Sequence, residues 1–321
     1  MRGERFLGRS RDRGYWRNLG CFTVRVVVVV VLVGTVGFGV WMARSRAMAL
    51  VHPGRSQPGC TPAERGVEQW EEVRFPSADN LQLGGWFIPP APQTDGATLI
   101  FIHGLGGNRG ELLDEAVMLS GHGYGALLFD LRNHGQSEGT ATTLGYAEVA
   151  DVRGAVAYLL ARPEVNPEHI GVVGSSMGGA VAIRAAARIP EIRAVVAQSA
   201  FSSLDENVSQ GVRALTGLPP LPLASLVIWF GEREAGIQLR QVRPIDDVGQ
   251  IAPRAILFIH GEQDPVVDVS NSLRLYQAAR EPKALYLVPN AGHGGLLAAA
   301  PAEFERRMVS FLDTHLRGRG R

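Results

Sequence analysis

A serine set among glycines, in the segment Gly174-Ser175-Ser176-Met177-Gly178, is the group in this chain best suited to carry out chemistry. The pattern G-x-S-x-G, with Ser176 at its centre, follows an apolar run at 170–173 and precedes an alanine-rich stretch of helical character. Where a strand turns this tightly into a helix, side chains two residues before and after the serine would collide, and the two glycines remove them. We therefore predict that Ser176 is a nucleophile.

A serine hydroxyl becomes a strong nucleophile only when a base takes its proton, and that base needs a carboxylate to orient it. Two later apolar runs are followed by groups of these types. Asp264 follows the run at 255–259, and His293 follows the run at 284–288. We predict that His293 is the general base for Ser176 and that Asp264 orients the imidazole ring.

Two of these assignments have neighbouring alternatives. Ser175 is the other candidate nucleophile, but centring the pattern on it would put Val173 and Met177 where small side chains are required. Asp268 is the other candidate acid, but Asp264 directly follows the strand and its His-Gly turn, whereas Asp268 is better placed to cap the next helix.

The remaining histidines do not suggest a metal site or a cofactor. His103 and His260 stand in His-Gly pairs at strand ends, and we expect them to be structural hydrogen-bonding groups. No pair of histidines has the H-x-x-x-H spacing of metal ligands. The glycine-rich segment 104–107 lacks the Lys-Ser/Thr of a phosphate-binding loop and the third glycine of a dinucleotide-binding fingerprint. We predict neither a metal nor a cofactor.

The elements that must position these residues are alternating strands and helices. Apolar or alternating runs typical of strands occupy residues 68–75, 81–88, 98–102, 125–129, 170–173, 194–197, 255–259 and 284–288. Helical patterns separate the later runs, so we predict a mostly parallel sheet covered on both faces, with an antiparallel edge formed by the first two runs. In such sheets functional residues gather at the carboxyl ends of the strands.

The order Ser176, Asp264, His293 resembles that of the α/β-hydrolase superfamily, and the resemblance extends from about residue 67 to 316. Other motifs carry it too: H-G-L-G-G at 103–107, F-D-L-R-N-H-G-Q-S at 129–137 and H-G-E-Q-D at 260–264. It implies an α/β-hydrolase fold in which the backbone N–H groups of Leu105 and Met177 form the oxyanion hole. A serine nucleophile implies hydrolysis of a carboxylic ester, thioester or amide through an acyl-enzyme.

Within the superfamily, the early hairpin, the H-G-x-G-G loop and a short insertion look like membrane-anchored serine hydrolases and like S33 aminopeptidase-like or lysophospholipase-like members. We therefore expect a serine esterase acting on a small-molecule or lipid acyl ester, with the apolar segment 218–230 as a possible acyl-chain pocket. The alternative is a serine aminopeptidase, in which Glu232 or Glu234 would bind a substrate ammonium group. A non-catalytic binding protein of this fold is disfavoured, because all three predicted catalytic residues are present.

The N-terminal region has the pattern of a membrane anchor. A basic tail at 1–25 precedes an apolar run at 26–42 that contains six consecutive valines, and 17 residues in a helix span about 25 Å. The excess of arginine on the N-terminal side favours a cytoplasmic N-terminus with the hydrolase domain on the extracytoplasmic side. A cleaved signal peptide is the alternative, because Ala47-Met48-Ala49 resembles a cleavage site; Arg44 and Arg46 before it disfavour cleavage.

The rest of the chain divides into a linker at 43–62 and a hydrolase domain at 63–321, with a helical lid insertion at about 201–250. Nine arginines and two acidic residues precede residue 47, whereas the remainder holds 23 basic and 29 acidic residues. The basic character is therefore confined to the tail, and we expect no nucleic-acid partner. Cys21 and Cys60 flank the apolar run, so a disulfide between them is not expected.

Overall fold

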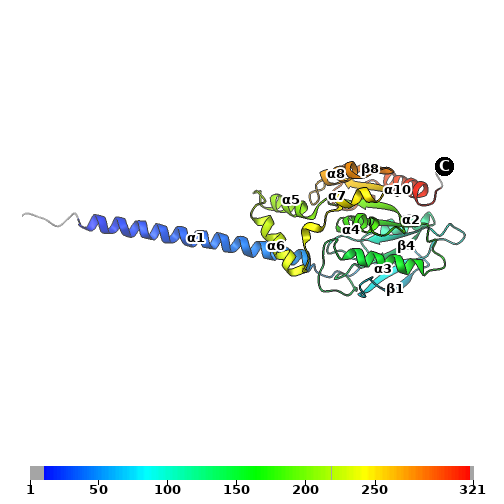
Figure 1. Ribbon diagram of the computed structural model, residues 1–321, viewed down its shortest axis with the longest axis horizontal. Helices are drawn as coiled ribbons and strands as arrows, with labels where there is room; N and C mark the ends of the chain where they lie inside the picture. The colour runs from blue at the N-terminus through cyan, green and yellow to red at the C-terminus, as the bar shows by residue number, and fades with distance from the viewer. Residues whose placement is uncertain (1–10, 218, 319–321) are drawn as a thin grey trace, which may run out of the picture.

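The computed structural model describes residues 11–217 and 219–318, with side chains described from Phe22 onward, and within them an eight-stranded sheet forms the centre (Figure 1). The spatial order of its strands is β1-β2-β4-β3-β5-β6-β7-β8. The strands are β1 (Glu71–Pro76), β2 (Gln82–Ile88), β3 (Thr98–Ile102), β4 (Gly125–Phe129), β5 (Ile170–Ser175), β6 (Ile192–Gln198), β7 (Ala255–Gly261) and β8 (Lys283–Val288).

Strand directions agree with the expected mostly parallel sheet. β1 pairs antiparallel with β2, and β2 pairs antiparallel with β4. The remaining neighbours, from β4 through β3 to β8, are parallel. The runs at 98–102 and 125–129 coincide with β3 and β4, and the other expected strands differ from the observed ones by a few residues at their ends.

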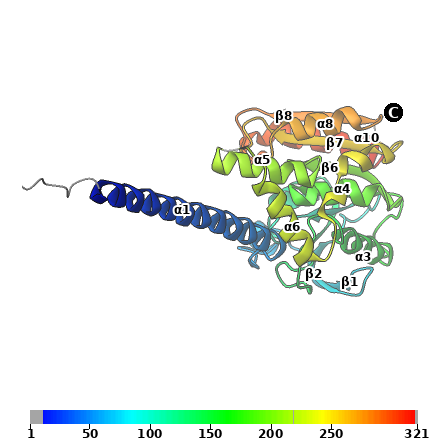
Figure 2. The ribbon, with the colours of Figure 1, turned by 60° about the vertical axis from the view of Figure 1, so that its left-hand side comes forward.

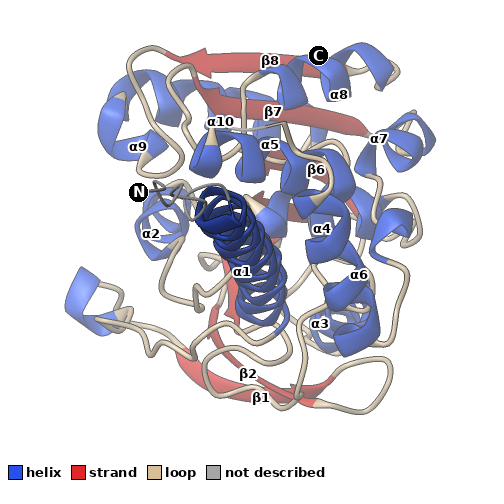
Figure 3. Cartoon of the chain, turned by 90° about the vertical axis from the view of Figure 1, so that its left-hand side faces the viewer, coloured by secondary structure: helices blue, strands red, loops and turns tan. Residues whose placement is uncertain are grey.

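Helices cover both faces of the sheet, because its inner strands bury side chains on both sides (Figure 3). One face carries α2 (Leu113–Gly121), α9 (Leu296–Ala299) and α10 (Pro301–His315), which share a buried apolar cluster with it. The other face carries α3 (Glu148–Leu160), α4 (Met177–Ala186) and α8 (Ser270–Ala278). A mostly parallel sheet with helices on both faces is the arrangement that the sequence analysis predicted.

The insertion between β6 and β7 is helical. It contains α5 (Leu204–Thr216), α6 (Leu223–Ala235) and the single-turn α7 (Pro244–Asp247), together with short 3₁₀ turns at Leu239–Gln241 and Val248–Gln250; a further 3₁₀ turn, Ala63–Arg65, precedes β1. Because the insertion leaves the carboxyl end of β6, it lies at the edge of the sheet where functional residues gather. Leu218, which the sequence analysis included in a possible acyl-chain pocket, lies outside the described residues.

The N-terminal helix α1 (Arg11–Val51) is longer than expected and projects far from the sheet (Figure 2). Residues 43–51 belong to this helix, so the linker expected at 43–62 was wrong for that part. The physical reason is that residues 43–51 contain no glycine or proline, and the first helix breaker is Pro53. Residues 1–10 of the expected basic tail lie outside the described residues.

Candidate active site

Ser176 lies in the turn between β5 and α4, at the carboxyl edge of the sheet. Its backbone has φ +54° and ψ −117°, a sparsely populated conformation that persists only where the surroundings enforce it. A Cβ atom at Gly174 would collide with the carbonyl oxygen of Gly178, and one at Gly178 would collide with the carbonyl oxygen of Ile102. Both glycines are therefore needed for the turn that exposes the serine.

The fold brings the three predicted catalytic side chains into one hydrogen-bonded chain. The Ser176 hydroxyl lies 2.8 Å from Nε2 of His293, and Nδ1 of His293 lies 2.7 Å from Oδ2 of Asp264. The three residues follow β5, β8 and β7 respectively, which end at the same edge of the sheet. With the ring proton on Nδ1, this geometry leaves Nε2 free to accept the serine proton.

The carboxylate of Asp264 is buried and is held at both of its oxygens. Oδ1 accepts the backbone amides of Val266 (2.8 Å) and Val267 (2.9 Å), while Oδ2 also lies 3.1 Å from Nε2 of His260. Burial acts to raise the pKa of Asp264, but hydrogen bonds from His260 and His293 and from the two amides outweigh it and hold the pKa well below its usual value. Asp264 is therefore ionised at neutral pH.

His260 has a structural position and does not touch Ser176. It is fully buried, its Nδ1 lies 2.6 Å from the Ser272 hydroxyl, and its Nε2 lies 2.8 Å from the carbonyl oxygen of Val267. These contacts tie α8 and the loop after β7 to the carboxylate of Asp264. The sequence analysis expected a structural histidine here but not its contact with Asp264.

The two alternative residues point elsewhere. Asp268 accepts the backbone amide of Ser270 (2.9 Å), the first residue of α8, from the position just before the N-cap residue Val269. The Ser175 side chain lies in the wall of a cavity that Glu111 also lines. Neither side chain joins the hydrogen-bonded chain through His293.

The segment 104–107, which follows β3, leaves one backbone amide free to bind an oxyanion. Three of its amides have acceptors: Gly104 donates to both oxygens of Glu111 (3.0 and 3.1 Å), Gly106 to Nε2 of His134 (3.1 Å), and Gly107 to the carbonyl of Gly104 (3.2 Å). Within the described chain, the amides of Leu105 and Met177 have no such acceptor. Met177 is the first residue of α4, where the helix dipole favours negative charge.

His103 holds this loop in place through the two nitrogens of its ring. Its Nδ1 lies 2.7 Å from the carbonyl oxygen of Gly104, and its Nε2 accepts the backbone amide of Leu131 at 3.0 Å. Burial lowers the pKa of His103 to about 3, so the ring is neutral. A neutral ring with one donor and one acceptor fits the two contacts, which is the structural role expected from the sequence.

Glu111 is a residue of the site that the sequence analysis missed. Its carboxylate accepts the amide of Gly104 at both oxygens, and its side chain lines the same cavity as Ser175 and His293, so it fixes the oxyanion loop beside the turn that carries the nucleophile. Burial raises its pKa, and these hydrogen bonds together with the nearby His293 oppose the rise. The available signal was a lone acid shortly after the H-G-L-G-G motif.

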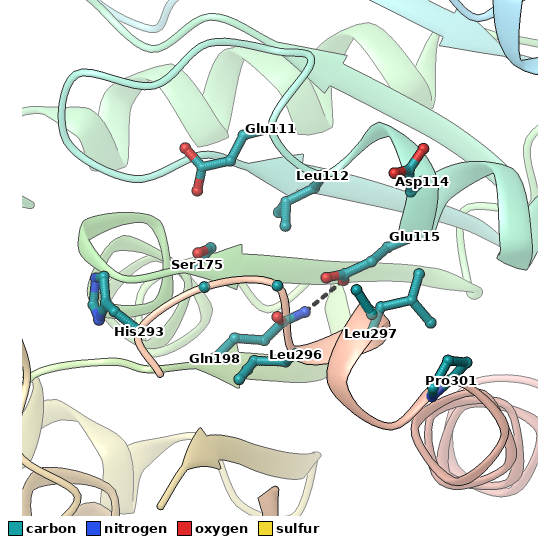
Figure 4. Close-up of a pocket in the computed structure, with 13 residues that line it drawn as sticks. Glu111, Leu112, Asp114, Glu115, Ser175, Gln198, His293, Leu296, Leu297 and Pro301 are labelled. Atoms are coloured by element: carbon teal, nitrogen blue, oxygen red, sulfur yellow. Dashed lines mark hydrogen bonds between the residues drawn. The ribbon is translucent and has the colours of Figure 1, made fainter. Parts of the chain in front are cut away.

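A cavity of about 320 Å³ opens beside His293 and Ser175 (Figure 4). The residues lining it are Glu111, Leu112, Asp114, Glu115, Ser175, Gln198, His293, Gly294, Gly295, Leu296, Leu297, Ala298 and Pro301. Burial raises the pKa of Glu115 to about 8, while the side-chain amide of Gln198 donates to it at 2.6 Å. The cavity therefore combines apolar walls with carboxyl groups and extends to the imidazole of His293.

Among the described residues, no cluster of three or more histidine, cysteine, aspartate or glutamate side chains could hold a metal ion. Cys60 is a free thiol that accepts a hydrogen bond from Arg65 at 3.4 Å.

Comparison with known proteins places residues 97–220 in a family described as the alpha/beta hydrolase fold. The uncharacterised protein YqkD of Bacillus subtilis is 31% identical over 250 residues, which cover 77% of this chain and 81% of that protein. An uncharacterised protein of Mycobacterium tuberculosis is 33% identical over 278 residues, covering 85% and 89% of the two chains.

The solved structure of an esterase from Pyrococcus furiosus is 28% identical, covers 83% of this chain and 98% of its own, and superposes with a TM-score of 0.70. This likeness supports a hydrolase. The chain belongs to the α/β-hydrolase fold family.

Proposed function

We propose that this protein is a serine hydrolase that cleaves carboxylic esters or thioesters through Ser176, His293 and Asp264. The observation that carries the proposal is the hydrogen-bonded chain from the Ser176 hydroxyl through the imidazole to a buried carboxylate. In this arrangement the imidazole takes the hydroxyl proton as the oxygen attacks, and the carboxylate stabilises the imidazolium that forms. The likeness to the esterase of Pyrococcus furiosus supports an ester as the bond that is cleaved.

In the first half-reaction, Oγ of Ser176 bonds to the carbonyl carbon while its proton moves to Nε2 of His293. The carbonyl electron pair moves onto oxygen, and the amides of Leu105 and Met177 donate hydrogen bonds to that oxyanion. When the tetrahedral intermediate collapses, the bond to the leaving alkoxide or thiolate breaks and the imidazolium supplies its proton. The products are an alcohol or thiol and an acyl group on Ser176.

The second half-reaction reverses these roles with water. His293 takes a proton from a water molecule whose oxygen attacks the acyl carbon, and the same two amides bind the second oxyanion. Collapse breaks the bond to Oγ of Ser176, which regains its proton from the imidazolium. A carboxylic acid leaves, and the enzyme returns to its starting state.

The finer assignment, to membrane-anchored members of the S33 aminopeptidase-like or lysophospholipase-like type, is part of the proposal. The idea of an acyl-chain pocket within 218–230 needs revision, because Val227 and Ile228 are buried in the core and the cavity beside His293 is lined by other segments. Leu296 and Leu297 are apolar groups that do line this cavity. An acyl chain or an alcohol group would contact them.

The aminopeptidase alternative keeps one supporting observation, although not from the residues first considered. Glu234 pairs with His52, and Glu232 lines a separate groove, so neither faces Ser176. The cavity beside His293 is instead lined by Glu111 and Glu115, together with Asp114. A carboxylate at this place would bind the ammonium group of a substrate.

We also propose that α1 is a retained membrane anchor. Phe22–Val51 is long and apolar enough to cross a membrane, and the first two thirds of it is exposed to the surroundings. Ala47, which belongs to the possible signal-cleavage site, is fully buried against the domain together with Ala43. Cleavage after Ala49 would remove both and uncover the apolar surface beneath them, which favours retention. The arginine excess before the apolar run favours a cytoplasmic N-terminus.

Turnover by the purified full-length protein tests the function. We expect p-nitrophenyl esters of graded chain length and acyl thioesters to be hydrolysed, aminoacyl anilides to be poor substrates, and Ser176→Ala to lose activity. Ser175→Ala is the matched control, because it removes a neighbouring hydroxyl outside the hydrogen-bonded chain. Faster turnover of anilides would favour the aminopeptidase, and no turnover of any substrate would favour a binding protein.

A further inference from the structure

The last turns of α1 are part of the folded domain. Ala43, Ala47 and Val51, one face of the helix, are fully buried, and α1 lies against α6 of the insertion. The carbonyl oxygen of Val51 accepts the amide of Thr142 (2.8 Å) and the side-chain amide of Asn133 (3.2 Å). The helix is therefore fixed to the domain at its end, and the direction in which it leaves the domain sets where a membrane would lie.

The chain that follows α1 runs directly to the candidate active site. His52 pairs with Glu234 of α6 at 2.7 Å, and the hydroxyl of Ser56 donates to the carbonyl oxygen of Gly106 at 3.0 Å. Asn108 in turn donates to Ser56 at 2.9 Å. The anchor, the insertion and the proposed oxyanion loop are thus joined by direct contacts.

These contacts limit the distance between the site and the membrane. From Trp41, at the end of the apolar run, to Val51 there are ten residues, or no more than about 15 Å along a helix. The headgroup layer on one side of a bilayer takes up roughly 5–8 Å of that. Because Arg44 and Arg46 are exposed just beyond Trp41, they lie at the level of the headgroups.

The α5–α6 tip, defined as residues 213–217 and 219–222, lies on the side of the domain from which α1 departs (Figures 1 and 2). Leu215 is 56% exposed and Leu221 is 70% exposed, which is more than any other described large apolar residue outside α1. Arg213 is the charged residue of the described tip. A surface that is apolar and weakly basic fits the boundary between the headgroups and acyl chains of an anionic bilayer.

We propose that the α5–α6 tip inserts Leu215 and Leu221 into the bilayer surface beside α1, so that the active site receives esters that reside in the membrane. This inference rests on the proposed serine hydrolase and on α1 as its anchor, and it names the substrate class as bilayer-resident acyl esters. With α1 and the tip as two points of attachment, the side of the domain that holds the Ser56–Gly106 contact lies nearest the bilayer. A lipid then reaches the site without crossing bulk water, where exposure of an acyl chain is unfavourable.

A fluorescent label reads the position of the tip directly. The full chain, with Cys21 and Cys60 replaced by serine, carries an NBD label at Leu221→Cys and is reconstituted into vesicles of phosphatidylcholine and phosphatidylglycerol. We expect quenching by spin-labelled lipid and protection from aqueous iodide. Leu160→Cys is the matched control, because Leu160 is also exposed (44%) and is the last residue of α3. That end of α3 lies at the edge of the sheet opposite the α5–α6 tip.

An activity measurement separates this inference from the function on which it depends. We expect the double variant Leu215→Asp/Leu221→Asp to hydrolyse a vesicle-embedded acyl ester at least about tenfold more slowly, with unchanged turnover of soluble p-nitrophenyl butyrate. Leu160→Asp should change neither rate. The inference is overturned if the double variant loses activity equally on both substrates, if it keeps full activity on both, or if iodide quenches the label at Leu221→Cys. Each of these results leaves the proposed hydrolase intact. Wild-type inactivity on both esters would instead refute the hydrolase.

Discussion

The substitution Asp264→Asn removes one charge and two acceptor positions while keeping the shape of the side chain. Oδ1 accepts two backbone amides, from Val266 and Val267, so the amide oxygen of asparagine must occupy that place. Its NH₂ group then faces Nδ1 of His293, 2.7 Å away in the wild type. A donor at this place forces Nδ1 to become the acceptor and moves the ring proton to Nε2.

With its proton on Nε2, His293 can no longer accept the proton of Ser176, and the imidazolium also loses its buried counter-charge. A wrong tautomer of this kind lowers kcat by about 10⁴-fold, which corresponds to about 5 kcal/mol of activation free energy. We expect a loss of this size in kcat/KM for p-nitrophenyl butyrate, with the burst of p-nitrophenol slowed to the same extent.

Asp268→Asn is the matched control, because it makes the same chemical change four residues away at the start of α8. It should retain nearly wild-type kcat/KM and stability, because the side-chain oxygen of asparagine can accept the same Ser270 amide. Thermal unfolding of both variants checks that the fold is kept. The reasoning fails if Asp264→Asn keeps more than a tenth of the activity while Asp268→Asn loses it.

Three further changes test other parts of the structure. Burial raises the pKa of Glu115 from 4.5 to about 8, so its contribution to the stability of the fold is complete below pH 4.5 and is lost as the pH rises to about 8. Thermal unfolding in detergent should therefore show Tm falling over that pH range, and falling less in the variant Glu115→Gln. Gly178→Ala places a methyl group against the carbonyl oxygen of Ile102 and should abolish ester turnover while Gly211→Ala, in open space on α5, retains it. Glu111→Ala leaves the Gly104 amide without its acceptor and should lower kcat by about 10²-fold with little change in KM, as expected when an oxyanion donor is displaced; a rise in KM alone would contradict this role.

Local patterns in the sequence were sufficient to predict the strands of the central sheet and the loops on which the predicted site residues lie. The runs at 98–102 and 125–129 coincide with β3 and β4, because strands buried on both faces are continuous apolar segments. The turn at Ser176 was recognisable because only glycine avoids the collisions at positions 174 and 178. The order of the later strands then determined which loops supply Asp264 and His293.

Contacts between distant segments were not predictable from such patterns. Residues 43–51 contain no helix breaker, yet their burial depends on α6, which follows about 180 residues later. Likewise, Glu111 is an ordinary acidic residue until the fold places its carboxylate against the Gly104 amide, in the cavity that Ser175 and His293 also line. In both cases the stabilising free energy comes from tertiary packing or from a hydrogen bond formed only in the folded chain. Contacts of this kind leave no periodic signal in the sequence.

The most direct measurement is the location of a covalent adduct on the nucleophile. The full-length protein is treated with a fluorophosphonate, digested and mapped by tandem mass spectrometry, with a sample of Asp264→Asn treated in parallel. We expect a single phosphonyl group on Ser176 in the wild type and a much slower appearance of the same adduct in the variant. An adduct on Ser175 or on a distant residue, or none at all, would contradict catalysis by Ser176 with His293 and Asp264.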